Sequence, residues 1–209
     1  DFDDVTHKGI TNISTDDVAV AQELGYVIKL VGDVREVESG ISAEVSPTFL
    51  PKNHPLASVN DVMNAVFVES IGIGESMYYG PGAGQKPTAT SVLADIIRIA
   101  RRLSDGNVGK PFNEFRRDLP LANPADVKSN YYFALDTPDE KGKILHLSEI
   151  FNSEDISFEQ VLQQKANGTT ARIVVITHAM SKTQLKAVTE KLEAAEDFTV
   201  VNTLKVLSN

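Results

Sequence analysis

The residues best suited to chemistry in this chain form a glycine-rich turn, Gly80-Pro81-Gly82-Ala83-Gly84. Glycines at alternate positions leave bare backbone that a ligand or another chain segment can approach closely. A helix is predicted soon after the turn, and the amides at a helix N-terminus favour an anionic group. The turn is therefore either a cradle for part of a cofactor or anionic substrate, or a device that lets a helix pack closely on a sheet. The pattern is neither Gly-x-Gly-x-x-Gly nor a P-loop, because Lys86 is followed by proline.

Other reactive side chains do not form a convincing catalytic or metal-binding set. The carboxylates Asp136, Asp139 and Glu140 could do acid/base work, but a solvated acidic turn is the favoured interpretation. The four histidines are far apart in the sequence, without acidic or cysteine partners at metal-ligand spacing. No Gly-x-Ser-x-Gly motif is present. We therefore assign no catalytic residue and no metal ligand.

Composition excludes several classes of partner. The 209 residues carry a formal net charge of −9, which disfavours binding to nucleic acid or to an anionic membrane. No apolar run approaches the roughly 20 residues that a membrane helix needs. The absence of cysteine suits a reducing compartment, and we expect a cytoplasmic protein. Because the chain starts at Asp1 without methionine, we expect it to be cut from a longer protein.

Sequence patterns predict an α/β region with a mixed sheet in the first part of the chain. Ser14 should cap a helix that ends near Leu24, and Ser58 should cap a brief helical turn. A longer amphipathic helix is predicted from about Ala89 to Leu103 by apolar residues at helical spacing. Strands are expected at 26–31, 40–45 and 65–68. From about residue 108 to 128 the sequence has three prolines and no periodicity, which indicates a linker.

The remainder of the chain has the order βαββαβ. The predicted strands lie at 131–135, 156–163, 172–176 and 198–206, and Ser181 with Gln184 forms a capping box for the second helix. This order is typical of a ferredoxin-like antiparallel sheet with two helices on one face. The predicted fold class is α+β, with one domain over residues 1–128 and another over residues 129–209.

The first domain resembles the substrate-binding and dimerisation region of homoserine dehydrogenase. Four segments carry the resemblance: Gly9-Ile10, the stretch 23–30, His54-Pro55-Leu56-Ala57 with Asn64-Ala65-Val66, and the turn 80–84 followed by Pro87-Thr88-Ala89. The resemblance implies that Gly80, Pro81, Gly82, Ala83 and Gly84 lie against the nicotinamide end of an NADP or NAD cofactor. It also implies that the strands around residues 27, 45 and 67 form a mixed sheet through which a homodimer pairs.

The second domain resembles an ACT domain, a small module that senses amino acids. The resemblance rests on the βαββαβ order, on Asp136-x-Pro138 with Gly142-x-Ile144-Leu145, and on the stretch 173–178. It implies an effector site in which Asp136 accepts the ammonium of an amino acid such as L-threonine. The amides near Gly142, Lys143 and Ile144 would bind its carboxylate. Three residues intervene between Pro138 and Gly142, where most ACT domains have glycine directly after proline, so a purely structural ACT pair is the alternative.

Together the resemblances imply the C-terminal portion of an oxidoreductase that interconverts L-homoserine and L-aspartate-4-semialdehyde. The family's nucleotide-binding Gly-x-Gly-x-x-Gly turn and its catalytic segment do not occur in this chain, so we expect the chain alone to be inactive. Two alternatives stay open: a free-standing regulatory protein that senses an amino acid, and a dimerisation scaffold that binds no small molecule.

Overall fold

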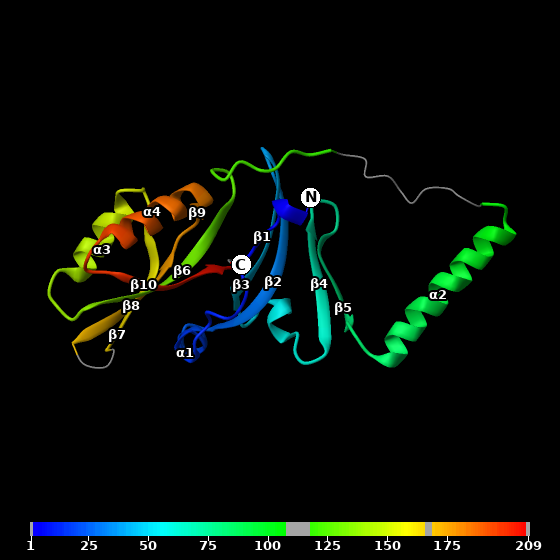
Figure 1. Ribbon diagram of the computed structural model, residues 1–209, viewed down its shortest axis with the longest axis horizontal. Helices are drawn as coiled ribbons and strands as arrows, with labels where there is room; N and C mark the ends of the chain where they lie inside the picture. The colour runs from blue at the N-terminus through cyan, green and yellow to red at the C-terminus, as the bar shows by residue number, and fades with distance from the viewer. Residues whose placement is uncertain (1, 108–117, 166–168, 208–209) are drawn as a thin grey trace. The chain divides into compact units, whose positions relative to one another are not determined.

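The computed structural model describes residues 2–107, 118–165 and 169–207 and divides the chain into two compact units (Figure 1). The first unit combines Asp1–Lys52 with Leu119–Asn209, and the second is Asn53–Asp118. The predicted domain boundary at residue 128 does not coincide with a border between these units. The physical reason is that N-terminal strands pair with C-terminal strands in a single sheet. Local preferences for helix or strand do not show which distant strands pair.

The first unit is built on an eight-stranded sheet with the central order β1-β3-β10-β6-β8-β7, in which β2 also pairs with β3 and β9 with β6. The strands are β1 (Thr6–His7), β2 (Tyr26–Val37), β3 (Gly40–Pro51), β6 (Lys128–Pro138), β7 (Phe158–Lys165), β8 (Thr170–Thr177), β9 (Met180–Ser181) and β10 (Thr199–Val206). The short 3-10 helix η1 (Phe2–Asp4) precedes β1. The sheet is mixed, because β3 runs parallel to β1 and β10 but antiparallel to β2.

The C-terminal part of this sheet has the predicted βαββαβ order. Helix α3 (Lys143–Asn152) follows β6, and α4 (Lys182–Ala194) precedes β10. Each neighbouring pair in β10-β6-β8-β7 is antiparallel. The capping box at α4 is confirmed: the Ser181 hydroxyl accepts the amide of Gln184, and the Gln184 side chain accepts the amide of Ser181. The predicted α+β class, with a mixed sheet and a ferredoxin-like segment, is confirmed.

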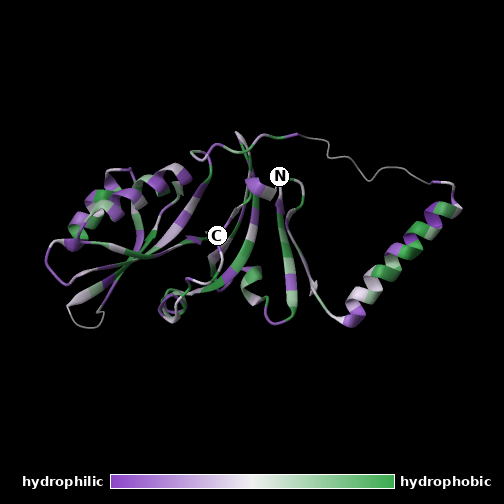
Figure 2. Cartoon of the chain, viewed as in Figure 1, coloured by the Kyte–Doolittle hydropathy of each residue, from purple (hydrophilic) through white to green (hydrophobic). Residues whose placement is uncertain are grey.

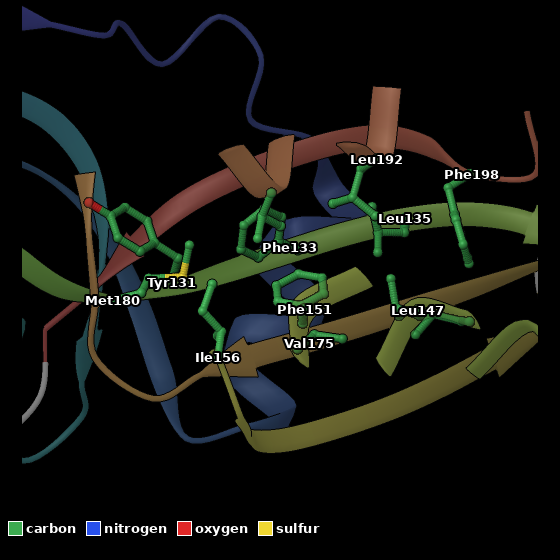
Figure 3. Packing of buried hydrophobic residues seen from close by; sticks show 12 residues of the cluster. Tyr131, Phe133, Leu135, Leu147, Phe151, Ile156, Val175, Met180, Leu192 and Phe198 are labelled. Carbon is green, nitrogen blue, oxygen red and sulfur yellow. The ribbon is translucent and has the colours of Figure 1, made fainter. Parts of the chain in front are cut away.

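The main core lies between this sheet and helices α3 and α4. Alternate residues of β6 point toward the helices, and Phe133 packs edge to face on Phe151 of α3 with ring centroids 5.2 Å apart. Figure 3 shows these side chains converging from the sheet and both helices. Burial of apolar surface on one stripe of each helix is the principal force that holds the helices on the sheet.

On the opposite face of β6, β8 and β10, apolar residues pack against α1 (Thr15–Glu23) and against Phe49 of β3. Tyr132 of β6 stacks on Phe49 of β3, with centroids 4.5 Å apart. Its hydroxyl donates to Asp17 of α1 over 2.9 Å, and Asn202 donates to the same carboxylate over 3.0 Å. The predicted Ser14 cap is confirmed, since Ser14 accepts the amide of Asp17. The capped end of α1 is thus fixed to the sheet by hydrogen bonds that satisfy a buried carboxylate.

The second unit contains η2 (Pro55–Ser58), the hairpin β4 (Met63–Ser70) and β5 (Gly74–Pro81), and α2 (Gln85–Ser104). The prediction of a helical turn capped by Ser58 is wrong. The turn comes before Ser58, and His54 caps it by accepting the Leu56 amide at Nδ1 over 3.2 Å. Helix α2 begins four residues earlier than predicted, because Pro87 occupies its first turn, where a missing N–H costs nothing.

Helix α2 contains no buried residue among those that the structure describes. Green, hydrophobic segments alternate with purple, hydrophilic ones along α2 in Figure 2. Val92, Ile96 and Leu103 of the predicted apolar stripe are each more than half exposed. No helix in the described residues is long and apolar enough to cross a membrane.

Two further expectations are changed by the structure. The strands around Val27, Val45 and Phe67 do not share one sheet, because β4 and β5 form a separate two-stranded sheet. The predicted linker lies partly outside the described residues. Its last part belongs to the first unit, where Leu121 forms a parallel bridge with Ile41.

Candidate functional sites

The glycine-rich turn joins β5 to α2 in the second unit. Gly80 and Pro81 end β5, and the Gly82 amide donates to the Val62 carbonyl over 3.3 Å. A Cβ atom at Gly82 would lie 1.9 Å from Nδ2 of Asn64, so a side chain there would require the Asn64 side chain to move. A Cβ atom at Gly80 would meet open space. Contact with Asn64 therefore favours glycine at position 82, whereas no contact does so at position 80.

The turn ends at Gly84, which begins α2 with a φ of +133° and gives the helix no side-chain cap. Thr88 is bonded through its amide to the Gly84 carbonyl over 3.0 Å. The amides of Gln85 and Lys86 precede this first intrahelical bond, as the first amides of any helix do. They are donors that suit an amide oxygen or an anionic group. Residues 80–84 stay a predicted cofactor contact.

A second candidate site surrounds the start of α3 in the first unit. A hollow of about 310 Å³ is lined by three of the four predicted effector residues, Gly142, Lys143 and Ile144. Gly142 begins the helix in the left-handed region, with a φ of +89° and no side-chain cap. An uncapped helix start presents amide donors to a carboxylate. The glycine is needed for this backbone conformation, because other residues rarely adopt it.

The fourth predicted residue, Asp136, is not among the residues that line this hollow. It follows Tyr132 and Ala134 on the face of β6 that packs toward α1. The Arg172 guanidinium donates to both of its carboxylate oxygens, over 2.8 and 3.1 Å, and also reaches Asp16 over 3.4 Å. The hydrogen bonds to Asp136 are the main cause that raises the pKa of Arg172. Asp136 thus already holds a bidentate partner.

Asp136 instead lines a second, more open hollow of about 710 Å³. Thr137, Pro138 and Glu140 line both hollows, which therefore lie on either side of the loop after β6. The second hollow is bordered by several carboxylates, Glu140 among them. One side of this loop is thus rich in acceptors for an ammonium group, and the other offers amide donors for a carboxylate.

Lys143 is held at the rim by two carboxylates. Its ammonium lies 3.3 Å from Asp197 and 3.5 Å from Glu140, and His146 Nδ1 lies 3.0 Å from the same Asp197 oxygen. Desolvation raises the pKa of Asp197, but the hydrogen bonds from His146 and Lys143 outweigh it and bring the pKa below its ordinary value. Asp197, from the segment before β10, therefore ties that segment to the start of α3.

Thr137, Glu140 and Gln163 are among the lining residues of the first hollow that sequence reasoning did not assign to the site. Strand alternation places Thr137 on the helix-facing side together with Leu135, so its orientation could have been predicted from the sequence. The position of Gln163 could not, because it depends on how β7 pairs with β8. Among the described residues, no three histidines or carboxylates are placed to hold a metal ion.

A family model and two relatives of this chain all indicate the same enzyme family. Residues 1–97 match the family model of homoserine dehydrogenase. The homoserine dehydrogenase of Lactococcus lactis is 58% identical over 207 residues, which cover 99% of this chain and 48% of that protein. The homoserine dehydrogenase of Bacillus subtilis is 34% identical over 198 residues, covering 94% of this chain and 46% of that protein.

A solved structure gives the same result. The homoserine dehydrogenase from Thiobacillus denitrificans superimposes with a TM-score of 0.90 at 30% identity, covering 100% of this chain and 48% of that one. The chain spans about half the length of the curated relatives it matches. Related to these enzymes along almost its whole length, the chain belongs to the homoserine dehydrogenase family and represents a C-terminal portion of such an enzyme.

Proposed function

We propose that this chain is the substrate-binding, dimerisation and regulatory part of a homoserine dehydrogenase that interconverts L-homoserine and L-aspartate-4-semialdehyde. The observation that carries the proposal is the 58% identity with the Lactococcus lactis enzyme over nearly the whole chain. The reaction needs NADP or NAD, whose nicotinamide ring accepts or donates the hydride. In this chain, Gly80 and the backbone that follows it would approach that ring, and the rest of the cofactor would rest on a nucleotide-binding domain.

The first test is cofactor binding. We expect the 209-residue chain to bind NADPH weakly or not at all in a fluorescence titration, because a Rossmann domain supplies most contacts to a dinucleotide. The full-length Lactococcus lactis enzyme serves as the positive control. A sub-micromolar dissociation constant for the chain alone would contradict the assignment of the glycine turn as only part of the site.

We further propose that the hollow at α3 binds an amino-acid effector, with L-threonine as the first candidate. The amides of Lys143 and Ile144 would bind its carboxylate. Glu140, in the loop after β6, or Asp136, near the end of β6, would accept its ammonium. Support comes from the pairing of an uncapped helix start with nearby carboxylates, an arrangement complementary to a zwitterion. This effector would inhibit the enzyme by feedback.

The second test is a calorimetric titration with L-threonine. Glu140→Gln should weaken binding about tenfold or more, since a hydrogen bond to a charged group is lost. Glu149→Gln, on α3 but not among the residues that line the hollow, is the matched control. If Glu140→Gln binds like the parent but Asp136→Asn does not, the ammonium contact belongs to Asp136. If neither variant changes the affinity, the effector does not bind at this loop.

A homodimer is also proposed, because sheet edges left unpaired invite association. The exposed apolar stripe of α2 supports packing against another part of the parent enzyme or a second copy. The hollow at α3 equally supports the alternative of a free-standing amino-acid sensor. A scaffold that binds no small molecule would leave the helix start at Gly142 without a function.

A further inference from the structure

Gln163 lies on β7, in the sheet that forms the floor of the hollow. In strand register, Leu135 of β6 faces Ile173 of β8, which in turn faces Gln163 of β7. Residues directly opposite one another on paired strands point to the same face of a sheet. Leu135 and Ile173 belong to the core under α3 and α4, so Gln163 lies on the same helix-facing side.

The row formed by Leu135, Ile173 and Gln163 is apolar at its first two residues and polar at Gln163. Ile173 is buried and Gln163 is exposed, and both line the hollow. The next residue, Gln164, points to the other face, where it donates to Glu23 of α1 over 3.3 Å. Gln163 has no corresponding bond among the described residues. Its amide is therefore free to donate to a ligand and to accept from it.

A second polar group in the hollow also lacks a partner. Thr137 is 2% exposed, and its hydroxyl has no hydrogen-bond partner within the described part of the chain. A buried hydroxyl without a partner carries a desolvation cost, so such a group is a common sign of a ligand or ordered water. Thr137 lines the same hollow as the uncapped start of α3. The hollow thus combines the amide donors at the start of α3 with the hydroxyl of Thr137 and the side-chain amide of Gln163.

The two strand spacings between β6 and β7 place Gln163 about 10 Å from the backbone of β6, across the floor formed by Ile173. A ligand whose carboxylate is held at Lys143 and Ile144 would extend its side chain over Ile173 toward Gln163. An aliphatic chain suits contact with Ile173. A hydroxyl on that chain would match the amide of Gln163.

We propose that Gln163 determines the specificity of the hollow at α3, selecting an α-amino acid with a small hydroxyl-bearing side chain over its apolar isostere. The inference rests on the proposed effector function of this hollow. A ligand hydroxyl gains a hydrogen bond to the Gln163 amide that the apolar isostere cannot make. Gln163 is a specificity residue and takes no part in the oxidation.

The test compares L-threonine with L-valine by calorimetry on the 209-residue chain. The parent should bind L-threonine about tenfold more tightly than L-valine, the effect expected for one hydrogen bond. Gln163→Leu should reduce this preference to about twofold or less while L-valine binding is retained or improved. Gln164→Leu, the neighbour on the opposite face, is the matched control and should keep the parent's preference. Circular dichroism checks that each variant is folded.

The outcomes separate the two claims. If the parent binds both amino acids equally, or if folded Gln163→Leu keeps the tenfold preference, the role of Gln163 is refuted while the effector function stands. If neither amino acid binds the parent at millimolar concentration, the effector function fails and the specificity claim fails with it. If Gln163→Leu loses the preference for L-threonine and Gln164→Leu keeps it, both the effector function and the role of Gln163 are supported.

Discussion

Replacing Lys205 with alanine should lower the free energy of unfolding by about 3–5 kcal/mol, the cost of breaking a buried ion pair from one side. Lys205 lies on β10, is 6% exposed and contacts the carboxylates of Asp33 on β2 and Glu44 on β3. Lys182 also reaches Glu44 over 2.7 Å, and Arg35 reaches Asp33 over 2.8 Å. The cluster joins the N-terminal hairpin to the ferredoxin-like segment, and without Lys205 its two carboxylates lose their shared partner.

Urea unfolding followed by far-ultraviolet circular dichroism measures this effect. Lys186→Ala is the control, because Lys186 is exposed on α4 and pairs with the exposed Glu190 over 3.8 Å. An exposed pair of this kind contributes less than about 1 kcal/mol. A loss below about 1 kcal/mol for Lys205→Ala would show that Lys182 and Arg35 suffice to hold the two carboxylates.

The same cluster predicts a dependence on pH. Desolvation raises the pKa values of Asp33 and Glu44, but their contacts with Lys205 and the neighbouring cations lower both below their ordinary values. A lowered carboxyl pKa contributes stability above the unfolded value, near pH 4, that is lost as the pH falls through the folded value. The parent should therefore lose stability on acidification below about pH 5, and Lys205→Ala should lose less over the same range.

Replacing Phe151 with alanine should cost about 3–5 kcal/mol of unfolding free energy. Phe151 is fully buried on α3 and packs edge to face with Phe133 at 5.2 Å and with Phe158 at 4.9 Å between ring centroids. Truncation removes apolar burial and leaves a cavity between helix and sheet, which the surrounding backbone only partly fills. Leu145→Ala, at an exposed position of the same helix, controls for helix propensity.

The measurement is again urea unfolding, with the midpoint and slope fitted separately. A change in slope for Phe151→Ala would indicate a loosened native state rather than a simple loss of packing energy. If the variant were as stable as Leu145→Ala, the contact between α3 and the sheet would not depend on this ring. Because α3 also forms one wall of the hollow, a loosened helix should weaken L-threonine binding as well.

The sequence predicted features that depend on residues close together in the chain. The capping boxes at Ser14 and Ser181 involve residues three apart, and their hydrogen bonds form within a single helical turn. The apolar stripe of α2 could be predicted for the same reason, since one period of a helix spans few residues. Homology to one family was likewise visible in short segments at fixed spacing.

Features that depend on distant residues escaped prediction. Asp136 looked like a free ammonium acceptor, but its partner Arg172 is 36 residues away on the neighbouring strand. The tight fit of Gly82 depends on Asn64 of the paired strand. The boundary near residue 128 was predicted from the aperiodic stretch before it and the βαββαβ order after it, and β10 pairs with β3 across that position.

The family resemblance, the βαββαβ order and the caps at Ser14 and Ser181 could be predicted from the sequence, because each depends on a short local pattern of residues. Three contacts could be found only in the folded chain: Asp136 is bound to Arg172, Lys205 joins the N-terminal hairpin to the last strand, and Gln163 lines the hollow at the start of α3. These contacts follow from strand register and sheet order. Register is set by the fit of whole apolar faces against one another, which no short stretch of sequence contains.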